Sequence, residues 1–181
     1  QRAVEPLELK ALEFVMRNGA RSHDLRIDAT PPAGWGQRFQ VVGKFRRPLL
    51  SLHAGRWADW DGQVFADSSQ VDISQLRRYV SLGGGVELRE GTGAVRAWID
   101  VARGELVGGV ADLSLEEVGT TLGPGLDSMD LKSLSGRIGG KRLEGGFQVF
   151  TQGLQFQTRD GLRWPGGNVS VSHAQAAGQA S

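Results

Sequence analysis

Apolar and polar residues alternate along most of this chain with a period of two. From Val95 to Val101 every second residue is apolar, and Arg96 and Asp100 lie between them. Because successive side chains of a strand point to opposite faces, such a run predicts a strand with one apolar and one mostly polar face. The pattern recurs in residues 23–29, 147–149, 154–157 and 168–172.

Glycine-containing breaks separate these runs, and strands in such close series predict an antiparallel meander. In the segment 4–17 the apolar phase shifts near Ala11, which a β-bulge or burial on both faces would explain. Further strands are predicted at residues 23–29, 39–45, 86–90, 93–102, 105–115, 129–139, 143–151, 153–159 and 168–173. Turns are predicted at Asn18-Gly19, Asp61-Gly62, Glu90-Gly91, Arg103-Gly104, Gly139-Gly140, Gln152-Gly153 and Asp160-Gly161.

One segment breaks the alternation. The sequence from Asp72 to Gln75 has the form of a capping box, and apolar residues follow it at helical spacing. We predict a helix near residues 73–82 that stops at Gly83-Gly84-Gly85. A second short helical turn is expected around Leu115–Leu122, so the fold class is mainly β with one or two short helices.

Composition narrows the function classes. The chain of 181 residues has 27 glycines, about twice the usual ~7% share, as many tight turns require. Its net charge of +1 argues against a nucleic-acid partner, which needs a strongly basic face. The absence of cysteine excludes disulfides and thiolate metal sites. Because the chain starts at Gln1 with strand-like sequence, we interpret it as a piece of something longer.

Catalytic chemistry finds little support in the sequence. Ser22-His23-Asp24 contains the residue types of a hydrolytic triad, but adjacent residues on a strand point to opposite faces. Asp59 and Asp61 flank Trp60 as in some glycoside hydrolases, although a turn with packed tryptophans explains them better. No metal motif or nucleotide-binding loop is present. We therefore expect no enzyme activity, no catalytic residue, no metal and no cofactor.

The order of several degenerate motifs resembles a known family. Residues 60–65 (WDGQVF) precede the predicted helix, and residues 91–98 (GTGAVRAW) open a later strand. Residues 110–115 (VADLSL) and 131–137 (LKSLSGR) follow, before the segment from Phe147 to Gly161. This serial order resembles the YhdP branch of the AsmA-like envelope proteins, which are related to TamB. The resemblance covers residues 55–175 well and the first fifty loosely.

The resemblance implies a fold and a function. Members of the family are anchored in the inner membrane by an N-terminal helix, and their body is a long curved β-sheet with a hydrophobic, taco-like groove in the periplasm. They are thought to carry phospholipid between the inner and outer membranes without catalysis. This chain would be an internal periplasmic fragment without the anchor, with phospholipid, both membranes and neighbouring segments of the same protein as partners.

Alternation alone supplies the candidate groove residues. They share the apolar phase of the predicted strands: Leu25, Ile27, Phe39, Val41, Val95, Ile99, Val101, Leu113, Phe147, Val149, Leu154 and Phe156. By the same reasoning, residues 1–50 are N-terminal strands of the sheet, residues 51–174 are the groove segment and residues 175–181 are a flexible tail.

A closed core remains the alternative for the same pattern. The apolar face would then pack inside a β-sandwich, and exposed tryptophans such as Trp57, Trp60, Trp98 or Trp164 would bind a carbohydrate or protein ligand. The two interpretations differ in one observable property, which is whether the apolar face is dry core or accessible surface.

Overall fold

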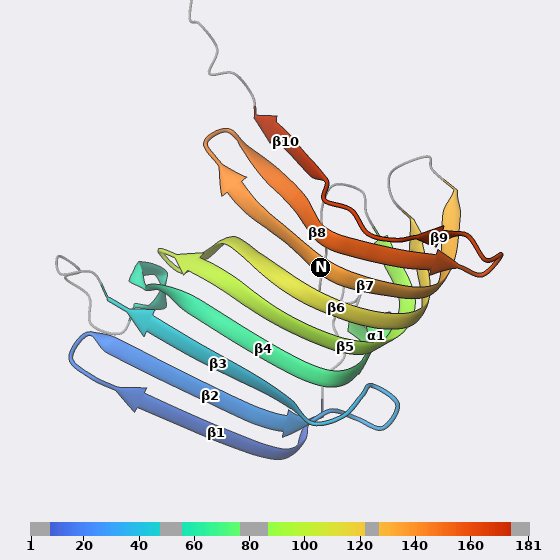
Figure 1. Ribbon diagram of the computed structural model, residues 1–181. Helices are drawn as coiled ribbons and strands as arrows, with labels where there is room; N and C mark the ends of the chain where they lie inside the picture. Colours follow the sequence, from blue (N-terminus) through green and yellow to red (C-terminus); the bar gives the residue numbers. More distant parts are fainter. Residues whose placement is uncertain (1–7, 48–55, 77–86, 122–126, 175–181) are drawn as a thin grey trace, which may run out of the picture.

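The computed structural model describes residues 8–47, 56–76, 87–121 and 127–174, in which ten strands form one antiparallel sheet (Figure 1). The strands are β1 (Lys10–Asn18), β2 (Ser22–Thr30), β3 (Phe39–Arg46), β4 (Asp61–Asp72), β5 (Glu87–Ala102), β6 (Glu105–Thr121), β7 (Ser128–Leu143), β8 (Gly146–Thr158), β9 (Arg163–Trp164) and β10 (Ser170–Ala174). Two short helices accompany them, the 3-10 helix η1 (Trp57–Asp59) and the α-helix α1 (Ile73–Leu76).

Consecutive strands from β1 to β9 pair with one another, which confirms the predicted meander. The order is β1-β2-β3-β4-β5-β6-β7-β8-β10, and β9 pairs with the other end of the free edge of β8. Thus Trp164 of β9 lies opposite Phe156, and Val171 of β10 lies opposite Val149. The sheet has two open edges, β1 and β10, within the part of the chain that the structure describes.

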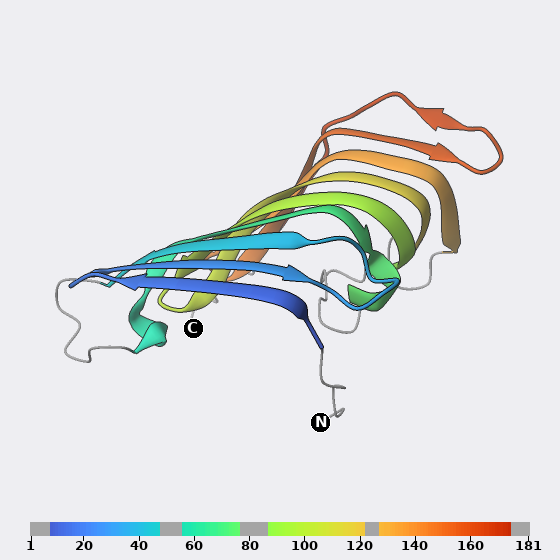
Figure 2. The same cartoon turned by 90° about the horizontal axis from the view of Figure 1, so that it is seen from below.

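The sheet is curved, as predicted, and the curvature is concentrated in the long strands. Figure 2 shows β5 to β7 curling over at one end, whereas β1 to β3 stay nearly flat. Gly93 contributes to this bend with φ 149°, and a Cβ atom there would lie 2.1 Å from the backbone oxygen of Ser114. Glu117 of β6 adopts φ 52° at a bulge opposite the segment Glu90–Thr92 of β5. Bulges of this kind bend a strand and increase its twist.

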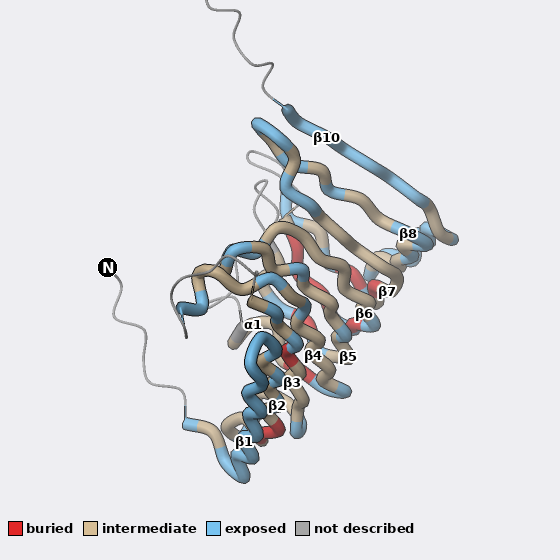
Figure 3. The backbone as a smooth tube through the Cα atoms, turned by 90° about the vertical axis from the view of Figure 1, so that its left-hand side faces the viewer, coloured by how far each residue is buried: buried red, intermediate tan, exposed pale blue. Residues whose placement is uncertain are grey.

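The buried apolar cluster lies inside this bend. Leu115, Val118, Leu131 and Leu134 are at most 9% exposed, and Ile73 of α1 packs against them. Figure 3 shows most of the buried residues gathered around the bend of β5 to β7. Elsewhere in the described ranges, Ala29 and Val71 are the only buried apolar residues. We refer to the four residues Leu115, Val118, Leu131 and Leu134 as the bend cluster.

The helical predictions were partly right. Asp72 caps α1 as expected, because its Oδ1 accepts a hydrogen bond of 2.9 Å from the backbone N–H of Ser74. The helix is described as far as Leu76, and residues 77–86 lie outside the described ranges. The second predicted turn at 115–122 was wrong, because β6 continues to Thr121. Its bulge brings Leu115 and Val118 to the same face, and that spacing imitates a helix.

The turn predictions separate into two groups. Asn18-Gly19, Arg103-Gly104 and Asp160-Gly161 do connect strands, as predicted. The other four lie inside strands and were wrong: Asp61-Gly62 in β4, Glu90-Gly91 in β5, Gly139-Gly140 in β7 and Gln152-Gly153 in β8. The two strands predicted on either side of residue 91 are therefore the single strand β5. Those predicted on either side of residue 152 are the single strand β8.

Elsewhere, the phase shift near Ala11 is a bulge, with φ 47° at that residue and a register shift between Lys10 and Glu13. The predicted division at residue 50 stays a prediction, and the tail 175–181 lies outside the described ranges.

Candidate functional site

Strand register places the predicted groove residues on one face of the sheet. Directly opposed residues in neighbouring strands share a face. Three cross-strand rows show this arrangement: Leu25, Gly43, Val64, Ile99, Gly109, Gly140 and Val149; Ile27, Val41, Ala66, Ala97, Ala111 and Ile138; and Ala29, Phe39, Ser68, Val95, Leu113 and Gly136. A further row contains His23, Phe45, Gly62 and Val101. We call this surface the apolar face.

A bulge brings the two halves of β8 into the same phase. Phe147 and Val149 are at odd positions, whereas Leu154 and Phe156 are at even positions. Gly153 adopts φ 58° between them, and the register with β7 shifts between Ser135 and Arg137. Because one extra residue reverses the alternation, all four apolar side chains belong to the apolar face.

The apolar face is the concave side of the sheet. Ile73 of α1 packs against the bend cluster, and Val95, Leu113 and Phe156 pack against the same cluster. Figure 2 shows α1 inside the curl of the long strands. The twelve predicted residues therefore line the inside of the curve.

These residues are not buried like a core. None of the twelve predicted residues is buried, and Phe147 and Val149 are 42% and 47% exposed. By contrast, Leu115 and Val118 of the bend cluster are 2% and 1% exposed. A contiguous apolar surface that stays accessible is unusual for a soluble domain and marks a surface for binding.

Sequence reasoning missed the middle of this face. Ala66, Ala97 and Ala111 form its central row, with Val64 and Ile138 beside them. The alternation signal was present in each strand, but small residues contribute little to it. The alignment of the three alanines across β4, β5 and β6 became visible only through the register.

The opposite, convex face is held by charged pairs. Asp67, Arg96, Asp112 and Arg137 oppose one another in successive strands, so the charges alternate along the row. The Arg137 guanidinium donates two hydrogen bonds of 2.6 and 2.9 Å to the Asp112 carboxylate, and these bonds lower the pKa of that carboxyl group. Arg96 lies 3.7 Å from Asp67.

An aromatic row runs beside these charges. The residues are Val42, Phe65, Trp98, Val110 and Phe150, in successive strands except that Gly139 of β7 precedes Phe150. The rings of Phe65 and Trp98 are 5.3 Å apart, and the Arg137 guanidinium lies 5.6 Å from the Trp98 ring. The Phe150 ring lies over Gly139, where a Cβ atom would meet it at 2.4 Å. Side chains on the convex face therefore make ion pairs and ring contacts with one another.

The other residues considered for chemistry have structural partners. The ring of His23 stacks on Trp60 at 4.0 Å, and its Nδ1 lies 2.8 Å from Asn18 Oδ1. Ser22 and Asp24 are on the other face of β2, so the three residues do not converge. Asp61 Oδ1 accepts a hydrogen bond of 2.8 Å from the backbone N–H of Arg103.

Other titratable groups add little. In the described ranges, no group of three or more histidine, cysteine or acidic residues is arranged to hold a metal ion. His173 lies 5.8 Å from the Phe147 ring, and His53 is outside the described ranges. No described helix has the length and apolar character needed to cross a membrane.

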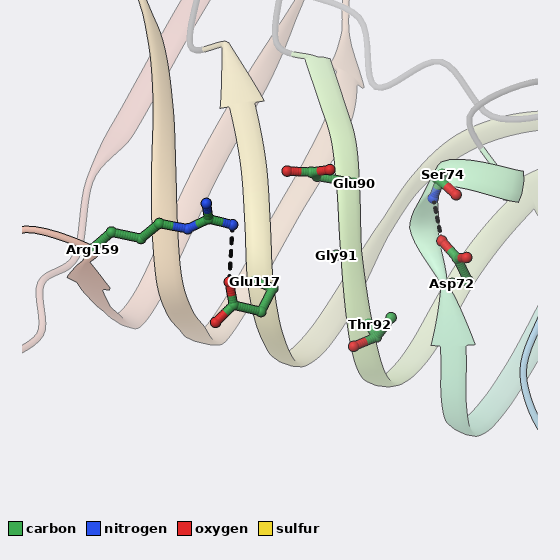
Figure 4. A pocket seen from close by; sticks show the side chains of 7 residues that line it. All are labelled: Asp72, Ser74, Glu90, Gly91, Thr92, Glu117 and Arg159. Carbon is green, nitrogen blue, oxygen red and sulfur yellow. Dashed lines mark hydrogen bonds and ion pairs between the residues drawn. The ribbon is translucent and has the colours of Figure 1, made fainter.

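A shallow polar pocket of about 280 Å³ lies near the bend (Figure 4). Its charged groups are largely paired locally, since Arg159 donates to Glu117 at 2.9 Å and Asp72 caps α1. It is lined by Asp72, Ser74, Glu90, Gly91, Thr92, Glu117 and Arg159, none of which belongs to the twelve predicted residues.

Comparison with known proteins identifies a family. A family model described as "YhdP protein" matches residues 1–181, which is the whole chain. No curated protein and no solved structure matches it.

Proposed function

The chain belongs to the YhdP family, and on this premise we propose that it is a periplasmic section of a larger envelope protein and provides a hydrophobic groove for phospholipid. Family membership favours a role in lipid transport of the AsmA-like kind. Lipid would pass along the apolar face between the inner and outer membranes, and the chain would perform no chemistry on it.

The observation that carries this proposal is the accessibility of the apolar face. Acyl chains gain about 0.8 kcal/mol for each methylene that leaves water. The face offers such a surface across eight strands, from Leu25 in β2 to Val171 in β10, and ten of the twelve predicted residues are half-buried while two are exposed. A tail needs no hydrogen-bond partners, which agrees with the nonpolar lining.

The arrangement of the two faces supports the same proposal. On the convex face, ion pairs and ring contacts between side chains hold neighbouring strands together. Most strands therefore need no second layer packed on the concave side. The concave face is therefore available for a ligand. Passive sliding is favoured because neighbouring rows present similar apolar side chains and no single deep pocket.

The alternative predicted from sequence was a closed β-sandwich. That fold is wrong for the described ranges, which form one sheet. The case for tryptophans as ligand-binding surfaces is also weaker, because three of them have internal ring contacts. Trp60 stacks on His23, Trp98 contacts Phe65, and Trp164 stacks on Phe156 at 6.2 Å. Trp57 and Trp164 nevertheless remain 67% and 45% exposed.

Site-specific photo-crosslinking tests the proposal. A benzophenone amino acid at Ile99 faces the groove, and the same probe at the adjacent Trp98 faces the convex side. After expression in a Gram-negative host and irradiation, mass spectrometry should find phospholipid attached at position 99 and not at position 98. Equal labelling at both positions, or none at either in protein whose circular dichroism is unchanged, would contradict a lipid groove.

A further inference from the structure

The strand ends opposite the bend carry a concentration of positive charge. Four arginines lie at or beside the ends of β2, β3, η1 and β5, and we call them the basic corner: Arg21, Arg47, Arg56 and Arg103. We propose that the basic corner binds the phosphate of a lipid headgroup while the acyl chains lie on the apolar face. This inference rests on the proposed function and adds the headgroup chemistry and the orientation of the lipid.

Backbone contacts bring the four arginines together. The N–H of Arg47 donates to the carbonyl of Arg21 at 2.9 Å, and the preceding residue Arg46, on the convex face, lies opposite Asp61 in the β3–β4 register. Asp61 in turn accepts the backbone N–H of Arg103. Arg56 begins η1, whose Trp57 lies against Gly104 in the β5–β6 turn.

Most of this charge has no internal partner. Among the described residues, no ion pair or side-chain hydrogen bond forms on the guanidinium groups of Arg21, Arg56 or Arg103, and all three side chains are exposed. Further along the same end of the sheet, Arg142 is neutralised by Glu105 at 2.6 Å. The basic corner thus presents guanidinium groups without an ion-pair partner, and guanidinium binds phosphate oxygens in a bidentate manner.

Buried nitrogen atoms without a hydrogen-bond partner lie at this corner and also at the bend. Nε2 of His23, Nε of Arg47 and Nε1 of Trp60 at the corner have no partner within the described structure, and neither has Nε of Arg89 at the bend end. Buried polar groups in folded proteins are nearly always hydrogen-bonded, so an orphaned group calls for an explanation. Nε of Arg47 and Nε1 of Trp60 are obligatory donors, and phosphate supplies only acceptors. At the corner, two of these atoms therefore lack an acceptor.

The corner is also joined to the apolar face. His23 and Phe45 belong to the first cross-strand row at this end, and Leu25 and Val64 lie in the next row inward. Trp57, 67% exposed beside the arginines, has the amphipathic ring that is enriched at lipid headgroup level in membranes. A lipid whose phosphate contacts the arginines would lay its tails over rows that are apolar.

The bend end of the sheet has the opposite character. Arg89 and Arg159 there are paired with Asp130 and Glu117, at 3.9 and 2.9 Å. Glu90 and Glu116 nearby have no ion-pair partner among the residues described. The negative charge at the bend end would repel a phosphate. The lipid would therefore lie across the apolar face in one orientation, with its headgroup at the basic corner.

Calorimetric titration of the chain with two short-chain lipids tests the assignment. The probes are dihexanoyl phosphatidylglycerol, dihexanoylglycerol, which lacks the phosphate, and inorganic phosphate alone. The test variant is Arg21→Gln with Arg56→Gln and Arg103→Gln. The matched control removes the same charge at exposed sites elsewhere, as Lys10→Gln with Lys132→Gln and Arg163→Gln.

We expect the test variant to weaken phosphatidylglycerol binding by about tenfold or more, and to leave dihexanoylglycerol binding within about twofold of the unmodified chain. The control variant should bind both lipids like the unmodified chain. Equal phosphatidylglycerol affinities of test and control variants would overturn the basic corner while leaving the groove intact. Inorganic phosphate binding as tightly as phosphatidylglycerol would overturn the lipid assignment. Failure of the unmodified chain to bind either lipid would instead count against the proposed function itself.

Discussion

The same strands form both faces of this sheet, but the two faces differ in how their side chains interact. On the convex face, neighbouring residues pair by charge and by ring contact, as Arg137 does with Asp112 and with Trp98. On the concave face, directly opposed residues such as Ala97 and Ala111 are apolar and make no polar contacts with one another. The difference teaches that a single-layer sheet can place its lateral stabilisation on one surface and leave the other accessible.

The concave face is itself divided. At the bend, Leu115 and Val118 are buried against α1 and against β7, as in an ordinary core. Along the floor, Ile99 and its neighbours remain half-exposed. Stability and accessibility are therefore separated along the strands as well as across the sheet, and the following substitutions test both separations.

Leu115→Ala should have the largest effect. Truncating a fully buried leucine leaves a cavity, and we expect a loss of about 3 kcal/mol in the free energy of unfolding, measured by urea titration. Leu106→Ala is the control, because Leu106 is 66% exposed and its truncation should change little. If both variants had the same stability, the bend cluster would not be the core of the molecule.

Adjacent residues on opposite faces offer a sharper comparison. Trp98→Ala should cost about 2 kcal/mol, because it removes the contacts with Phe65 and with the Arg137 guanidinium. Ile99→Ala should cost only about 1 kcal/mol, since its side chain is already half-exposed. The same urea titration measures both, and a reversed order would show that the concave floor, not the convex face, holds the strands together.

Asp112→Asn should have the smallest effect, and that effect should depend on pH. The folded-state pKa of Asp112 is lowered, chiefly by the hydrogen bonds from Arg137. Its stabilisation is therefore fully present above the unfolded pKa of about 3.9 and is lost as the pH falls through the lower folded value. Thermal melts at pH 7 should show a slightly less stable variant, and the difference should shrink in acid below about pH 4. A difference that grew with acidification would contradict this pairing.

Much of the fold could be predicted from the chain alone. Alternation between apolar and polar side chains identified the strands and the apolar phase in each, including that of Ile99 and Val149. The chain order of the strands then gave the meander. These features are local, so a short window of sequence contains the information that determines them.

Glycine shows where local information ends. A dipeptide ending in glycine is a turn at Arg103-Gly104 but a bulge at Gln152-Gly153, although glycine has a positive φ in both. Glu90-Gly91 likewise lies inside β5. Whether the chain reverses or continues depends on whether a partner strand is present beyond the glycine, which is a property of the tertiary structure. The basic corner was missed for a similar reason, because its arginines are far apart in sequence.

The sequential pairing of the strands has a consequence for how the molecule folds and grows. Because β1 to β7 each pair only with the strands before and after them, nearly all strand contacts are between consecutive strands, and the exception is the pairing of β10 with β8. Stability in such an array is a sum of nearest-neighbour terms, as in solenoid repeats. Folding can therefore begin at the strands around the bend cluster and add one hairpin at a time toward either edge. For the same reason a hairpin can be gained or lost at an edge in evolution without redesign of the strands already present.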